Sequence, residues 1–117
     1  MMKKILIVDD DPNIRDYLVS LLEDNGYATN TAIDVRDGLK IAKEYKPDLI
    51  TLDLEMPGEW GPRFYRQLSQ DNELKNTPVI VISGLSGNDY AISKAVATLS
   101  KPFDREELLN IIKENIV

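Results

Sequence analysis

The sequence of 117 residues contains no cysteine and no histidine. Without cysteine there are no disulfide bonds and no thiolate metal ligands, which fits a reducing cytoplasm. Without histidine the chain has no imidazole base, no imidazole metal ligand and no phosphohistidine of its own. No apolar run approaches the length of a membrane span, and Met1–Leu6 leads into a strand-like segment, not a signal peptide. We therefore expect a cytoplasmic protein without a membrane segment.

Positive charge is also scarce, since the chain has 14 Lys and Arg but 20 Asp and Glu, for a net charge of −6. Nucleic-acid backbones are held mainly by Lys and Arg, and no basic stripe stands out along the sequence. Nucleic acid is therefore not an expected partner. An excess of acidic residues can instead serve solubility, or it can form a local binding site for a hard cation.

Short apolar runs alternate with amphipathic segments of helical spacing. The runs predict strands at residues 5–8, 27–32, 49–52, 78–82 and 96–99. The predicted helices begin at Pro12, after the capping pair Asp34 and Asp37, at Gly61-Pro62, near residue 88, and after Asp104. Strands and helices that alternate with short loops indicate a doubly wound α/β fold, a parallel sheet with helices on both faces. We expect one domain over residues 1–117.

Polar residues follow four of the predicted strands directly. Asp9 and Asp10 follow the first strand, Asp53 the third, Ser83 ends the fourth, and Lys101 comes just after the fifth. Ligands of open parallel sheets sit outside the carboxyl ends of the strands, where the strand order reverses. If the order is 2-1-3-4-5, that point lies between the first and third strands. Asp9, Asp10 and Asp53 would then meet.

Three clustered carboxylates require a cation. Two unit charges about 4 Å apart repel by roughly 4 kcal/mol at an effective dielectric constant near 20. An all-oxygen ligand set suits Mg²⁺, while Lys101 would add a positive charge and Ser83 a hydroxyl donor. A carboxylate nucleophile, a divalent metal, a lysine and a hydroxyl together indicate a phosphoryl-transfer site.

Four segments, in order and at strand ends, carry a resemblance to a known family: residues 5–12 (ILIVDDDP), 48–58 (DLITLDLEMPG), 79–84 (VIVISG) and 101–103 (KPF). Over essentially its whole length the chain resembles the receiver domain of bacterial two-component response regulators. The resemblance implies a flavodoxin-like fold with a five-stranded sheet in the order 2-1-3-4-5.

The resemblance also implies roles for individual residues. Asp53 is the phosphoacceptor, and Mg²⁺ is bound by Asp9, Asp10, Asp53 and the backbone carbonyl of Glu55. The phosphoryl donor is a sensor histidine kinase or a histidine phosphotransfer protein, because this chain supplies no histidine.

For the remaining site residues, the resemblance implies that Ser83 is the switch hydroxyl and Lys101 the lysine that pairs with the phosphoryl group. It further implies a cis peptide bond between Lys101 and Pro102. Output is expected through contact with a downstream protein, and a homodimer is possible. The chain leaves no room for an output domain after the last helix, unless it belongs to a longer protein.

Some positions depart from the family pattern. Thr98 stands where receivers usually carry an aromatic residue or histidine, and the stretch between Ser83 and Lys101 is shorter by about four residues, close to one helical turn. Trp60 stands where aspartate is frequent before the glycine. We therefore expect a complete phosphorylation pocket with a non-standard fourth-helix and fifth-strand output face. Trp60 and Phe64 could pack inward or contact a partner.

Other interpretations remain open. Asp9 and Asp10 could be simple turn residues, and Asp11 is best interpreted as a helix cap. A pseudo-receiver that only binds partners is one alternative. A small phosphatase of the haloacid dehalogenase type is another, although such enzymes need an aspartate where this chain has Glu55. Flavodoxin-like electron transfer is disfavoured because an acidic first loop would repel the FMN phosphate.

Overall fold

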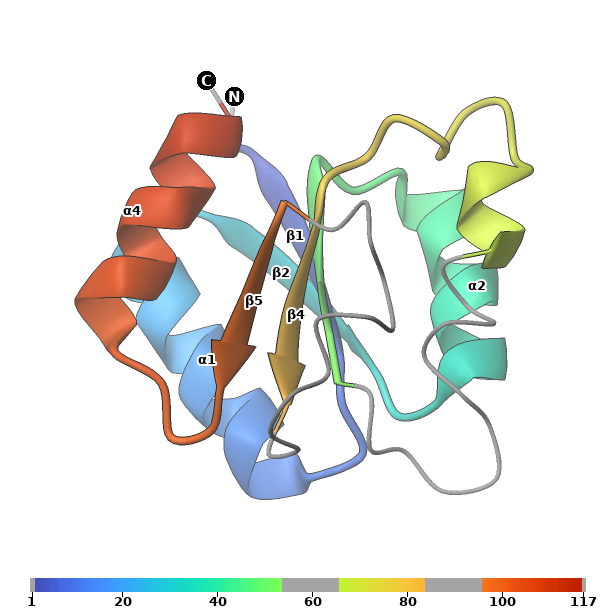
Figure 1. Cartoon of the computed structure of the whole chain (residues 1–117). Helices are drawn as coiled ribbons and strands as arrows, with labels where there is room; N and C mark the ends of the chain where they lie inside the picture. Colours follow the sequence, from blue (N-terminus) through green and yellow to red (C-terminus); the bar gives the residue numbers. More distant parts are fainter. Residues whose placement is uncertain (1, 54–65, 84–95, 117) are drawn as a thin grey trace.

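A parallel five-stranded sheet forms the centre of the molecule (Figure 1). The computed structural model describes residues 2–53, 66–83 and 96–116. The strand order is β2-β1-β3-β4-β5, as the family resemblance implied. The strands are β1 (Lys4–Val8), β2 (Ala28–Ala32), β3 (Leu49–Leu52), β4 (Val79–Ser83) and β5 (Ala97–Ser100). All four neighbouring pairs are parallel.

Helices cover both faces of this sheet, as expected for a doubly wound fold. Helices α1 (Pro12–Asp24) and α4 (Arg105–Asn115) lie on one face, and α2 (Val35–Tyr45) lies on the other (Figure 1). Residues 66–69 are helical and agree with the end of the helix predicted from Gly61. The helix predicted near residue 88 lies outside the described residues. No helix in the described ranges is both long enough and apolar enough to cross a bilayer.

Aspartates begin the described helices by accepting backbone N–H groups that would otherwise lack partners. Asp11 accepts from Asn13, Asp34 from Asp37, and Asp104 from Glu106, at 2.8–2.9 Å. These contacts confirm Asp11 as a cap. After α1, Gly26 adopts φ +89°, a left-handed conformation that glycine tolerates without strain.

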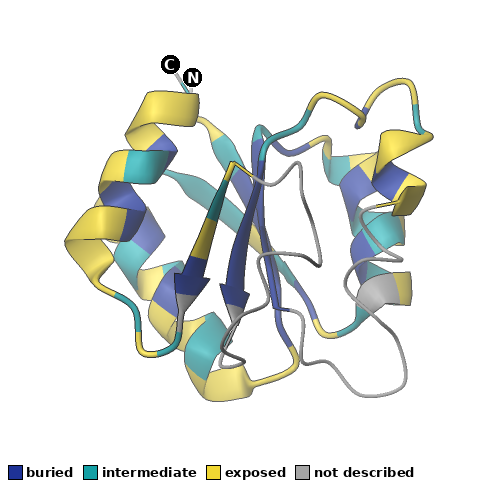
Figure 2. Ribbon diagram, viewed as in Figure 1, coloured by how far each residue is buried: buried dark blue, intermediate teal, exposed yellow. Residues whose placement is uncertain are grey.

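The sheet divides the apolar core into two clusters. Along β1, Ile5 and Ile7 face α1 and α4, while Leu6 and Val8 face the α2 side. Because each of these four residues is buried on one face or the other, they form an unbroken apolar run in the sequence. Figure 2 shows this buried sheet between helices with exposed outer surfaces. Each fully buried large side chain contributes about 1.5–3 kcal/mol relative to an exposed one.

The predicted strand limits differ from the observed ones by one residue at most ends. The last strand runs from Ala97 to Ser100 instead of 96–99. Val96 contributes one hydrogen bond, from its N–H to the Val79 carbonyl at 3.0 Å, and Ser100 pairs with Ser83 at the other end. Tyr27 lies outside β2. These shifts leave every strand end where the polar residues were expected.

Candidate functional site

The parallel register of β1 and β3 brings their carboxyl ends side by side. Val8 pairs with Leu52, so the next residues, Asp9 and Asp53, emerge together. The Asp53 N–H donates to the Val8 carbonyl at 2.9 Å, and the Asp9 N–H donates to the Ala32 carbonyl of β2 at 3.1 Å. Main-chain hydrogen bonds to neighbouring strands therefore hold both aspartates in place.

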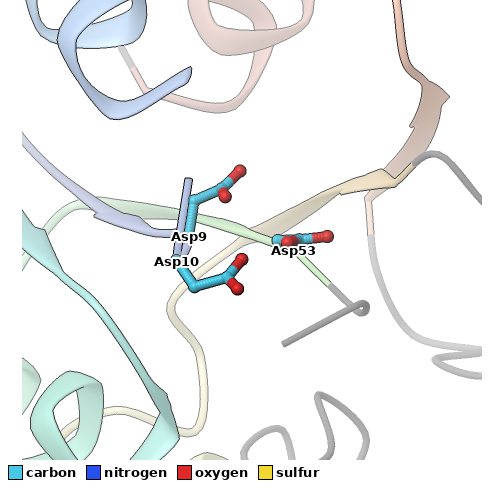
Figure 3. Close-up of side chains that lie close together, drawn as sticks. All are labelled: Asp9, Asp10 and Asp53. Carbon is cyan, nitrogen blue, oxygen red and sulfur yellow. The ribbon is translucent and has the colours of Figure 1, made fainter. Parts of the chain in front are cut away.

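Three carboxylates gather at this edge of the sheet. Oxygen atoms of Asp9, Asp10 and Asp53 all lie within 4.8 Å of one another. Figure 3 shows Asp9 and Asp10 following β1 and Asp53 following β3. Asp9 and Asp53 are each only 3% exposed, whereas Asp10 is open to solvent. The convergence expected from the sequence is thus present in the structure.

Lys101 reaches this cluster from the loop after β5. Its Nζ lies 3.1 Å from Oδ2 of Asp9 and 3.6 Å from Oδ2 of Asp53, and its side chain is 19% exposed. The peptide bond between Lys101 and Pro102 is cis, as implied by the resemblance. The ammonium group thereby bridges the two buried carboxylates.

The turn after β1 is further fixed by two donors. The Asp11 N–H donates to Oδ1 of Asp9 at 2.9 Å. The half-buried guanidinium of Arg15 donates through Nη1 to the Asp9 carbonyl oxygen at 2.8 Å. Sequence reasoning missed Arg15. One feature of the sequence could have pointed to it. The helix dipole favours acidic residues in the first turn of a helix, so an arginine in the first turn after Asp9–Asp11 is unexpected.

The donor set at this edge fits Mg²⁺. Three carboxylates and one ammonium leave a local charge of −2, which a single divalent cation would balance. The ligands that the described residues offer here are carboxylate oxygens, the type that hard cations prefer, and the exposed Asp10 leaves a side open to water. The residues present therefore suit a hard divalent ion better than a zinc-type ion, which favours nitrogen and sulfur.

Among the other residues singled out in the sequence, Ser83 and Thr98 fall within the described strands. Ser83 ends β4, so its backbone lies at the same edge of the sheet, but its side chain is outside the described part. Glu55, Trp60 and Phe64 lie outside the described residues. Thr98 is exposed on β5, opposite Val81 in the register with β4.

Comparison with known proteins agrees with this geometry. The family described as the response regulator receiver domain matches residues 5–113. The chain belongs to this family. Receiver domains signal through phosphorylation, bind Mg²⁺ at an acidic pocket, and interact with histidine kinases or downstream targets.

Two curated receiver proteins are similar over nearly the whole chain. Protein Rrf1 of Nitratidesulfovibrio vulgaris is 37% identical over 112 residues, covering 96% of this chain and 81% of that protein. Protein PilH of Pseudomonas aeruginosa is 36% identical over 115 residues, with 95% of each chain covered.

Solved structures show the same receiver fold. The response regulator TrrA of Thermotoga maritima, solved in complex with Mg²⁺-BeF, is 33% identical with a TM-score of 0.88, covering 97% of this chain and 98% of that one. The chemotaxis response regulator CheY4 of Vibrio cholerae is 30% identical with a TM-score of 0.89 at the same coverage.

Proposed function

We propose that residues 1–117 form a receiver domain that accepts a phosphoryl group on Asp53 from a phosphohistidine donor, in a reaction that needs Mg²⁺. The observation that carries this proposal is the convergence of Asp9, Asp10 and Asp53, with the Lys101 ammonium between the two buried carboxylates. Family membership supports it.

Asp53 suits the role of nucleophile. Its backbone N–H is bound by the Val8 carbonyl, and its Oδ2 lies 3.6 Å from the Lys101 ammonium, so the carboxylate is held at the end of β3. In the proposed step an Asp53 oxygen forms a bond to phosphorus while the P–N bond of the donor breaks. The leaving imidazole belongs to another protein, because this chain contains no histidine.

The surrounding residues would bind and orient the incoming group. Asp9, Asp10 and Asp53, with the Glu55 backbone carbonyl, are the proposed metal ligands. When bound there, Mg²⁺ would neutralise negative charge on the phosphoryl oxygens. Lys101 would pair with one phosphoryl oxygen, and the Ser83 hydroxyl would donate to another.

Intact-mass spectrometry after incubation with acetyl phosphate tests the proposal. With Mg²⁺ present, we expect one added phosphoryl group on the parent protein and none on Asp53→Asn. The matched control is Asp16→Asn, which removes an exposed carboxylate from α1 and should be phosphorylated normally. Equal modification of the parent and Asp53→Asn, or modification that persists in excess EDTA, would disprove the proposed site.

Signalling by this domain is proposed to run through protein–protein contacts in the cytoplasm, with a sensor kinase or phosphotransfer protein upstream and a protein target downstream. We propose no enzymatic turnover, so the protein should release no measurable product from a generic phosphomonoester. The exposed Thr98 supports the hypothesis that the output face around β5 is non-standard. A homodimer remains part of the proposal, to be tested by sedimentation with and without acetyl phosphate.

A further inference from the structure

Three cations form a stripe on the outer face of α2. Arg36, Lys40 and Lys43 are spaced by four and three residues, a spacing that places side chains on the same side of a helix. All three are exposed. No basic stripe was evident along the sequence, because other residues separate these cations, and only the helix brings them together. Figure 2 shows exposed positions on the side of α2 that points away from the sheet.

The opposite side of α2 holds the helix on the domain. Gly38 and Ala42 are buried, and Leu39 and Ile41 pack against the core cluster. The cations on the outer face therefore play no part in anchoring the helix.

The described residues give these cations no acidic partner within salt-bridge distance. Across residues 2–53, 66–83 and 96–116, none of the three takes part in a salt bridge. By contrast, Lys46 just after the helix pairs with Glu73 at 3.0 Å. Asp37 and Glu44 lie on the same helix, but among the described residues neither forms a salt bridge with these three cations, so the stripe can meet an external anion.

A groove lies at the N-terminal end of the stripe. It has a volume of about 610 Å³ and is lined by Ile33, Asp34, Arg36, Asp37 and Lys40. Ile33 is 54% exposed, an apolar side chain beside two cations. Asp34 is engaged as the helix cap, since its Oδ1 accepts the Asp37 N–H at 2.8 Å. Asp37 likewise faces the start of the helix, since its Oδ2 accepts the Ile33 N–H at 3.5 Å. The groove thus places one exposed apolar side chain beside two cations and two aspartates that cap the helix.

We propose that the outer face of α2 is a docking surface for an acidic segment of a partner protein, with an apolar side chain of that segment seated against Ile33. Charge complementarity favours this occupant. A nucleic acid would present phosphates over a long stretch and meet the acidic remainder of the domain, whereas a short acidic segment meets the stripe and only the few acids beside it.

The docking surface adjoins the acidic site but does not depend on it. Ile33 follows Ala32, whose carbonyl accepts the Asp9 N–H at 3.1 Å. A partner seated there would lie beside the Asp9–Asp10 turn. The proposal does not rest on phosphorylation of Asp53, so Asp53→Asn should dock the same segment.

Fluorescence anisotropy of a labelled glutamate-rich peptide containing one leucine tests the surface. The stripe variant and its control each replace three exposed cations by glutamine and lower the net charge equally: R36Q/K40Q/K43Q against K75Q/R105Q/K113Q. Saturable, salt-sensitive binding is expected for the parent and the control. The stripe variant should bind at least about tenfold more weakly, because three ion pairs with the peptide are lost. Circular dichroism confirms that both variants are folded.

A second variant tests the apolar part of the surface. Ile33→Ser should remove the preference for the leucine peptide over the same peptide with serine in place of leucine, and should retain the salt dependence. The proposal is overturned if the peptide does not bind at low salt, or if both triple variants weaken it equally. Tighter, stripe-dependent binding of a short DNA duplex would overturn it in favour of nucleic acid. Stripe-dependent self-association in sedimentation would instead identify a contact between copies of this chain.

Discussion

Removing the charge of Asp53 should stabilise the metal-free protein. In Asp53→Asn, the repulsion from Asp9 across at most 4.8 Å disappears, a term of about 3.5 kcal/mol at an effective dielectric constant near 20. The repulsion from Asp10 disappears too, but solvent screens it because Asp10 is exposed. The variant also loses the attraction between Asp53 and Lys101 at 3.6 Å, which opposes these gains by about 4.6 kcal/mol at the same dielectric constant.

The pairwise terms nearly cancel, so burial decides the sign. Asp53 is 3% exposed, and keeping a charge out of water costs several kcal/mol that the neutral amide avoids. Lys101 keeps its contact with Asp9 at 3.1 Å in the variant, so no buried charge is left alone. We expect Asp53→Asn to raise the free energy of unfolding by about 1–2 kcal/mol in EDTA.

Mg²⁺ should remove this advantage. At a free concentration of about 20 times its dissociation constant, an ion that binds only the folded state stabilises it by about 1.8 kcal/mol. The parent protein should gain this stabilisation, and the variant much less, because one of its three carboxylates is gone. Urea unfolding monitored by circular dichroism, with EDTA or MgCl₂, measures both effects, with Asp16→Asn as the matched charge control. A variant that is no more stable than the parent in EDTA, or that gains as much from Mg²⁺, would refute the electrostatic reasoning.

Three further outcomes can be measured on the same protein. Arg15→Gln should weaken Mg²⁺ binding several-fold in calorimetry, because the Asp9 carbonyl loses its guanidinium donor. Arg15→Lys should restore part of the affinity. Unchanged affinity in both variants would show that Arg15 does not support the site. Burial, and then the charge of Asp48, raises the pKa of Tyr45 above 10.0, so folding favours the neutral phenol. The stability that this shift contributes is full below pH 10.0 and is lost as the pH rises through the folded-state pKa, which absorbance titration against Tyr45→Phe will show. NMR shifts on phosphorylation should avoid Thr98, and shifts concentrated there would contradict the hypothesis of a non-standard output face.

Most of the sheet could be predicted because its three inner strands, β1, β3 and β4, are buried on both faces. Ile5 to Val8 must be apolar throughout, and a short apolar run bounded by turn residues has few other structures open to it. The limits of the strands depend on single hydrogen bonds, such as that from Val96 to Val79, and apolar pattern carries no information on these. Strand order is harder still, since periodicity does not distinguish 2-1-3-4-5 from other orders, and here the family resemblance supplied it.

The acidic residues were predictable for a different reason. A carboxylate placed directly after a buried strand loses part of its hydration, which costs free energy that a carboxylate in an exposed loop does not lose. Asp9, Asp10 and Asp53 therefore stand out even before their neighbours are known. Arg15 and the cations of α2 do not stand out, because an arginine or lysine on a helix is usually only solvated. Their meaning depends on what surrounds them in space: a carbonyl oxygen 2.8 Å from Arg15, and, among the described residues, no salt bridge to Lys40.

A basic face on an acidic receiver domain therefore has a physical consequence that composition alone conceals. Net charge governs approach from a distance, where the value of −6 repels anionic partners, but within a Debye length of about 8–10 Å the local charges of α2 dominate. A partner whose acidic segment is short gains the local attraction and meets few acids besides Asp34 and Asp37 at the groove. Phosphorylation of Asp53 would add negative charge beside the Asp9–Asp10 turn, whereas the stripe itself would keep its charge. Such a surface could then hold a partner in both states of the domain, leaving the phosphoryl group to control a different contact.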